Sequence, residues 1–209
     1  CCRAMHNLGL SRLMVVSPSR FELPAIERMA THAALSVVEN IQTHDTLSEA
    51  LAPFTYITGT TARMGKQRQM ICSPEQIAQK IISLASNNKV AVLFGPEDRG
   101  LGNDDLKYCH SLVNIPTADF SSLNLAQAVM IICYELFLGT QPGKEQSFQP
   151  RLATSHELEG MYAHLKEMLL NIDFINRANP DYWMNNFRRF FARVGLTAKE
   201  VRLIRGVCR

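Results

Sequence analysis

Short apolar runs alternate with helical patterns over residues 13–133. Four runs are rich in β-branched residues, which predicts strands at Leu13–Val16, Tyr56–Thr58, Val90–Phe94 and Leu112–Ile115. Strands that alternate with helices are typical of an α/β fold with a mainly parallel sheet. The periodicity therefore predicts that fold class for this part of the chain.

Three helices are expected between these strands. Residues 73–76 (Ser-Pro-Glu-Gln) have the spacing of a capping box with proline at the first helical position, which predicts a helix to about Ala85. A second capping box lies at residues 46–49, and residues 24–35 have the pattern of a third helix.

The pattern changes after residue 138. Residues 139–155 are polar and contain several proline and glycine residues, which indicates a linker. Residues 158–172 have the apolar spacing of an amphipathic helix. A second helix is expected over 181–194, ended by the glycine that follows, and the capping box at 197–200 opens a third. The chain therefore carries a helical extension.

Composition narrows the class of protein. Of 209 residues, 46% are hydrophobic and 20% are charged, which are globular proportions and exclude a disordered chain or a coiled-coil rod. No run reaches the ~18 apolar residues that span a bilayer. The first residues lack the pattern of a signal peptide, so we expect a cytosolic protein.

The six cysteines and six histidines are scattered, without a CxxC or HxxxH pair. We therefore expect reduced thiols and no metal site. Cys109 and His110 are neighbours and could suggest a nucleophile with its base. Neighbours on a strand point to opposite faces, however, which favours a structural role for both.

The net charge of +3 is unevenly distributed. Residues 177–209 hold eight basic and two acidic side chains, so the remainder of the chain is mildly acidic. A basic appendage on an acidic body is typical of polyanion-binding proteins. A solvated helix face would have the same composition, so both interpretations stay open.

Three segments are candidates for chemistry. The first is the glycine-rich loop at 95–102, which follows the strongest predicted strand, where open α/β sheets bind ligands. The second, residues 120–128, places serines and an asparagine at a helix start. The third is the segment Arg-Ala-Met-His-Asn-Leu-Gly-Leu at 3–10. Each of these three segments, taken alone, would also fit a tight turn or a helix cap without any role in catalysis.

Together and in this order, the segments resemble the three signature motifs of the SpoU (TrmH-type) branch of the SPOUT RNA methyltransferases. The resemblance covers Arg3 to about Leu138. The loop at 59–63 and the helical, arginine-rich tail are similar to bacterial tRNA cytidine/uridine 2′-O-methyltransferases, which act on position 32 of the anticodon loop.

This resemblance implies a deep trefoil knot in the α/β fold, bound S-adenosylmethionine, and a homodimer with each active site at the subunit boundary and tRNA as substrate. It divides the chain into a SPOUT methyltransferase domain at 1–138, a linker at 139–155 and a basic helical extension at 156–209. The family's first strand and its Asn-x-Gly loop precede the arginine-bearing helix, and we expect both to be missing from this sequence.

Site residues follow from matching positions in the family. The cofactor-binding positions are Thr60, Thr61, Ala62, Gly95, Ile115, Ser121, Ser122 and Leu123. The positions associated with catalysis or with positioning of the substrate are Arg3, Glu97, Ser122 and Asn124. Arg3 matches the family's catalytic arginine. Because arginine stays protonated near neutrality, we expect Arg3 to clamp a phosphate and orient the hydroxyl group.

Other readings remain. Ribosomal RNA is the competing substrate, and a non-catalytic knotted RNA-binding module would keep the basic tail without the chemistry. A nucleotide-dependent oxidoreductase is disfavoured because no GxGxxG motif follows a predicted strand.

Overall fold

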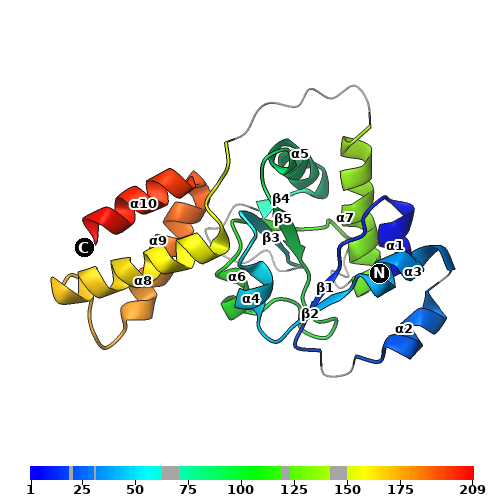
Figure 1. Ribbon diagram of the computed structural model, residues 1–209, viewed down its shortest axis with the longest axis horizontal. Helices are drawn as coiled ribbons and strands as arrows, with labels where there is room; N and C mark the ends of the chain where they lie inside the picture. Colours follow the sequence, from blue (N-terminus) through cyan, green and yellow to red (C-terminus); the bar gives the residue numbers. More distant parts are fainter. Residues whose placement is uncertain (19–20, 31, 63–70, 119–122, 142–149) are drawn as a thin grey trace.

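The computed structural model describes residues 1–18, 21–30, 32–62, 71–118, 123–141 and 150–209. Figure 1 shows an α/β part and, beside it, three helices from the C-terminal end of the chain. The two parts meet along the segment that leads into the first of these helices.

The α/β part is built on a four-stranded sheet in which every pairing is parallel. Its order is β4 (Ile71–Cys72), β6 (Ser111–Val113), β3 (Tyr56–Thr60) and β5 (Val90–Leu93). β3 and β6 are almost entirely buried, which is why their sequences are continuous apolar or small-residue runs. The prediction of an α/β fold with mainly parallel strands is confirmed.

A second, two-stranded parallel sheet pairs β1 (Met14–Val16) with β2 (Gln42–His44). Within the described ranges, no ladder joins this pair to the other four strands. The expected strand at 13–16 is present. β2 and β4 were not predicted, because each is only two or three residues long and β2 has the polar sequence Gln-Thr-His.

Helices pack around these sheets (Figure 1). Those of the α/β part are α1 (Cys2–Asn7), α2 (Leu23–Met29), α3 (Leu35–Glu39), α4 (Leu47–Leu51), α5 (Pro74–Ala85), α6 (Asn103–Leu106) and α7 (Leu125–Gly139), with a 3-10 turn at His32–Ala34. The single helix predicted over 24–35 is wrong. The chain becomes extended at Ala30, with φ −81° and ψ 138°, so α2 ends there.

The predicted caps are found where they were expected. The Ser73 side chain accepts from the Gln76 backbone N–H while the Gln76 side chain accepts from the Ser73 N–H, which completes a capping box on α5. On α4, Thr46 accepts from the Glu49 N–H. These local bonds fix where both helices begin.

The C-terminal helices have a core of their own. α8 (Ser155–Asn171), α9 (Pro180–Val194) and α10 (Ala198–Val207) enclose a cluster that includes Met161, Leu165 and Val201. α9 ends at Gly195, which has φ +69°, a conformation that side chains with a Cβ rarely adopt. The three predicted helices of the extension are therefore present.

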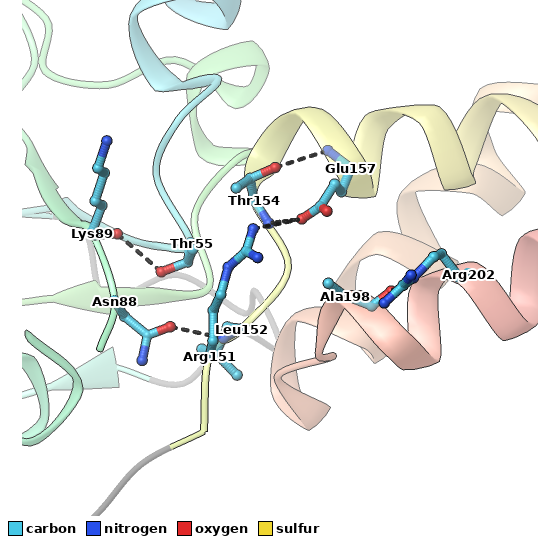
Figure 2. A network of polar contacts seen from close by, with 9 residues as sticks. All are labelled: Thr55, Asn88, Lys89, Arg151, Leu152, Thr154, Glu157, Ala198 and Arg202. Carbon is cyan, nitrogen blue, oxygen red and sulfur yellow. Dashed lines mark hydrogen bonds and ion pairs between the residues drawn. The ribbon is translucent and has the colours of Figure 1, made fainter. Parts of the chain in front are cut away.

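Figure 2 shows the junction between the two parts. The Asn88 side chain accepts from the Leu152 N–H at 2.8 Å, as Figure 2 shows. It also donates to the Pro150 carbonyl at 3.1 Å. Leu152 lies in the same hydrophobic cluster as Tyr56 and Ile77, and it forms an antiparallel bridge with Thr197. The segment before α8 is therefore bonded to the sheet on one side and to the helical extension on the other.

His110 is a buried titratable group within the main sheet region. Its Nδ1 accepts from the Ile57 N–H (3.1 Å), and its ring stacks on Tyr56 at 5.2 Å. Burial lowers the pKa of His110 from 6.5 to about 4, and the cation of Lys80 adds to that effect. A neutral ring is therefore part of the packing of β3, as expected from the structural interpretation of Cys109 and His110.

We predict that acid destabilises the protein through His110. The unfolded chain binds a proton there near pH 6.5 and the folded chain only near pH 4, so unfolding takes up a proton between these values. The contribution of His110 to the free energy of unfolding is fully present above pH 6.5. On the order of 3 kcal/mol of this free energy is lost as the pH falls to 4.

Urea unfolding at pH 7, 5.5 and 4 measures this loss. His110→Gln reduces the dependence on pH relative to the wild type, whereas His6→Gln, a change at an exposed histidine, preserves it. Equal pH dependence in all three proteins would contradict the prediction.

Candidate functional site

The candidate site lies at the carboxyl ends of three adjacent parallel strands. β3 ends at Thr60, which is in register with Val113, the last residue of β6. Gly59 is in register with Leu93, the last residue of β5. Because the strands are parallel, the segments that follow all leave the same edge of the sheet. Thr61, Gly95 and Ile115 belong to these three segments.

Hydrogen bonds join the three segments. The Thr60 hydroxyl donates to the Leu93 carbonyl (3.2 Å), and the Thr61 N–H donates to the Val113 carbonyl (3.0 Å). The Asn114 side chain donates to the Thr61 carbonyl (2.9 Å). Asn114 was not among the predicted site residues. A polar residue inside an otherwise apolar strand pattern was the signal that could have identified it.

Gly95 allows the loop after β5 to fold back on itself. A Cβ atom at this position would lie 2.1 Å from the Gly100 carbonyl carbon and 2.3 Å from the Leu101 nitrogen, both of them backbone atoms. The Gly100 N–H donates to the Pro96 carbonyl (2.8 Å), which closes the turn. The loop conformation therefore requires a residue without a side chain at 95.

Glu97 and Asn124 are brought together although 27 residues separate them. Asn124 Nδ2 donates to Glu97 Oε1 at 2.6 Å. Asn124 Oδ1 also accepts from the Ala126 N–H, which makes Asn124 the N-cap of α7. One side chain thus caps the helix and anchors the glycine-rich loop, and both residues are exposed to solvent.

The other predicted cofactor positions differ in their surroundings. Ile115 packs against the cluster under the main sheet, Leu123 is half-buried, and Ala62 is exposed at the end of the described segment after β3. Ser121 and Ser122 lie outside the described residues. The structure therefore brings Thr60, Thr61, Gly95 and Ile115 to one edge of the sheet.

Arg3 lies on α1, which packs against α7. Met5 is the buried anchor of α1, in a cluster with Val129 and Cys133, and Phe94 and Leu125 pack at its margin. These contacts hold α1 near the residues that adjoin Gly95 and Asn124. Arg3 itself is exposed, and among the described residues no hydrogen bond or ion pair links it to Glu97 or Asn124. The geometry leaves its side chain accessible to a ligand.

In the part of the chain that the structure describes, no group of three His, Cys, Asp or Glu side chains is placed to hold a metal ion. No helix within the described ranges is long and apolar enough to cross a membrane.

Comparison with known proteins identifies the class. Residues 1–134 match the model of the SpoU rRNA Methylase family, and residues 156–209 match that of the C-terminal domain of tRNA methyltransferase TrmJ. The chain therefore belongs to the SpoU methylase family. This membership confirms the prediction that it is an RNA methyltransferase.

Similar proteins carry a more specific name. A tRNA (cytidine/uridine-2′-O-)-methyltransferase TrmJ from Sodalis glossinidius is 36% identical, and the match covers 98% of this chain and 82% of that protein. A tRNA (cytidine/uridine/adenosine-2′-O-)-methyltransferase TrmJ from Pseudomonas aeruginosa is 35% identical over 98% of this chain and 84% of its own length. The crystal structure of TrmJ from Z. mobilis has a TM-score of 0.85 at 31% identity, covering 99% of this chain and 89% of that one.

Gly95→Ala is predicted to disrupt the loop. The added methyl group would overlap backbone atoms that cannot rotate away, so the free energy of unfolding should fall by about 1–3 kcal/mol. Gly102→Ala is the matched control, because a Cβ atom there would lie 3.5 Å from Asp105 Oδ2, an ordinary contact. Thermal unfolding of both variants checks this, and equal stability of the two would contradict it.

Proposed function

We propose that this protein transfers a methyl group from S-adenosylmethionine to a ribose 2′-hydroxyl of tRNA, at cytidine or uridine 32 of the anticodon loop. The observation that carries the proposal is the near full-length similarity to tRNA (cytidine/uridine-2′-O-)-methyltransferases. The site geometry supports it, because the residues matched to the family's cofactor loops meet at one sheet edge. Action on tRNA implies a cytosolic location.

The residues present fit the cofactor. Thr60, Thr61, Gly95 and Ile115 offer backbone groups and small or apolar side chains, which suit an adenosine moiety. The bonds from Thr60 to Leu93 and from Asn114 to Thr61 hold these segments in fixed positions before any ligand arrives. Ala62, Ser121, Ser122 and Leu123 are assigned to the same pocket from the resemblance.

S-adenosylmethionine supplies an electrophilic methyl group on a sulfonium centre. The ribose 2′ oxygen forms a bond to the methyl carbon as the carbon–sulfur bond breaks, the bonding electrons stay on sulfur, and the hydroxyl proton passes to solvent. Such an in-line displacement depends mainly on alignment. We assign Arg3 to a substrate phosphate and the 2′-hydroxyl, with Glu97, Ser122 and Asn124 positioning the loops and the nucleotide.

The proposal includes the organisation expected from the resemblance: a methyltransferase domain at 1–138 with a deep trefoil knot, a linker at 139–155 and the helical extension at 156–209. It also includes a homodimer. In support, α7 presents an apolar strip of Met130, Tyr134, Phe137 and Leu138, each 39–48% exposed. These residues lie on one face of the helix, and a second copy of the chain would cover them.

Methyl transfer to defined RNAs tests the function. We predict that labelled methyl groups enter tRNA transcripts with cytidine or uridine at position 32 and are excluded when that nucleotide lacks its 2′-hydroxyl. Arg3→Lys should lower kcat/KM about 100-fold because a point charge cannot replace the bidentate guanidinium. Arg12→Lys, at another exposed arginine, should have no effect.

Three results would contradict the proposal. Transfer to ribosomal RNA but not to tRNA would favour the competing substrate. Binding of tRNA without any transfer would favour a non-catalytic module. Full turnover by Arg3→Lys would exclude the proposed role of Arg3.

A further inference from the structure

A cavity of about 170 Å³ lies where the α/β part meets the helical extension. One wall comes from α6 and the residues that follow it, and the other comes from α9. Figure 1 places α6 on the side of the α/β part that faces the C-terminal helices. None of the lining residues belongs to the candidate site described above. The volume exceeds the ~30 Å³ share of one water several times over, so a multi-atom group fits.

Each wall presents the same pair of side chains, a carboxamide followed four residues later by a cation. On the first wall the pair is Asn103 and Lys107, and on the second it is Asn185 and Arg189. A spacing of four places both members of a pair on one face of a helix. Amide and cationic side chains are the groups that contact phosphate oxygens in nucleic-acid complexes.

Arg188, the neighbour of Arg189, is held in place by contacts of its own. Its guanidinium forms a bidentate pair with Glu159, with an Nη2 to Oε2 distance of 2.7 Å, and lies 4.3 Å from the centre of the Tyr162 ring. Arg188 therefore has a structural role in the cavity wall. Glu159 is thereby neutralised, which removes a carboxylate that would repel an anion.

Arg189 is the cation left for a ligand. Throughout the described part of the chain, no carboxylate lies within ion-pair distance of Arg189. The Lys107 ammonium lies 3.8 Å from the fully exposed carboxylate of Asp104 and 5.3 Å from the centre of the Tyr108 ring, and its charge also acts on Asp181. Exposed pairs contribute little free energy, so an anion in the cavity can compete with Asp104.

The buried thiol of Cys109 also lines the cavity, but it is not suited to nucleophilic catalysis. Burial, together with the nearby charge of Asp105, raises the pKa of Cys109 to about 12, so the thiol stays protonated and is a poor nucleophile. A binding role fits the cavity better than a catalytic one.

We infer that this cavity binds a backbone phosphate of the RNA substrate, through Lys107 and Arg189 with support from Asn103 and Asn185. The inference rests on the proposed function and adds to it a second contact, remote from the methylated nucleotide. Because the walls come from different parts of the chain, a phosphate held there would fix the RNA relative to both.

Binding of tRNA at several salt concentrations tests the site. The double variant Lys107→Gln/Arg189→Gln should raise the Kd about tenfold and reduce the slope of log Kd against log salt by about 1 to 2. Arg177→Gln/Lys199→Gln is the matched control, since it removes the same charges from exposed positions outside the cavity. It should change the Kd less than twofold.

A second variant tests the site without removal of either cation, in case the double variant fails to fold. Asn185→Asp keeps both cations and places a carboxylate at an exposed position in the cavity wall, so it should also weaken tRNA binding. Binding of S-adenosylhomocysteine should be unchanged in every variant.

The outcomes separate the two proposals. Equal losses in the cavity and control variants, or no loss in either, would overturn the phosphate site while wild-type methylation of tRNA upholds the function. Failure of the wild type itself to bind tRNA would overturn the function.

Discussion

The parallel pairing of β3 with β5 on one side and β6 on the other is the constraint on which the site depends. It brings three connecting segments to one edge of the sheet, although Thr61 in the first and Asn114 in the last are 53 residues apart in sequence. Side chains then join these segments to one another, through Thr60 and Asn114. The bond between Glu97 and Asn124 extends the arrangement to the first turn of α7. The site is thus built largely from backbone held by a buried sheet.

The same sheet positions the helical extension. Asn88 precedes β5 and bonds the segment that leads into α8. At the start of α8, the Ser155 N–H donates to the Phe54 carbonyl (2.7 Å) and the His156 N–H donates to the Ala52 carbonyl (3.3 Å). The buried side chain of Leu152 adds an apolar contact with the sheet's own core. These contacts place the helical extension beside the α/β part, so that side chains from α9 and from the region of α6 line one cavity.

Features that depend on neighbouring residues were predictable. The apolar strands β3 and β5, the capping box at Ser73 and the glycine stop at 195 follow from burial, local hydrogen bonds and backbone freedom. Other features depend on packing between distant segments. The polar strand β2 has no apolar period to reveal it. The hydrogen bond of Asn114 to Thr61 and the position of Arg189 in a cavity wall arise only when segments far apart in sequence meet. The candidate site was located through resemblance to a family, because each motif alone also fits a turn or a cap.

The central claim is that hydrogen-bonded strand ends form the cofactor site. Calorimetric titration with S-adenosylhomocysteine tests it most directly, on the wild type and on Asn114→Ala, which removes the bond to the Thr61 carbonyl. We predict saturable binding to the wild type with one ligand per chain, weakened about tenfold in the variant by loss of the hydrogen bond and of loop order. No binding to the wild type, or equal binding by both proteins, would contradict the account.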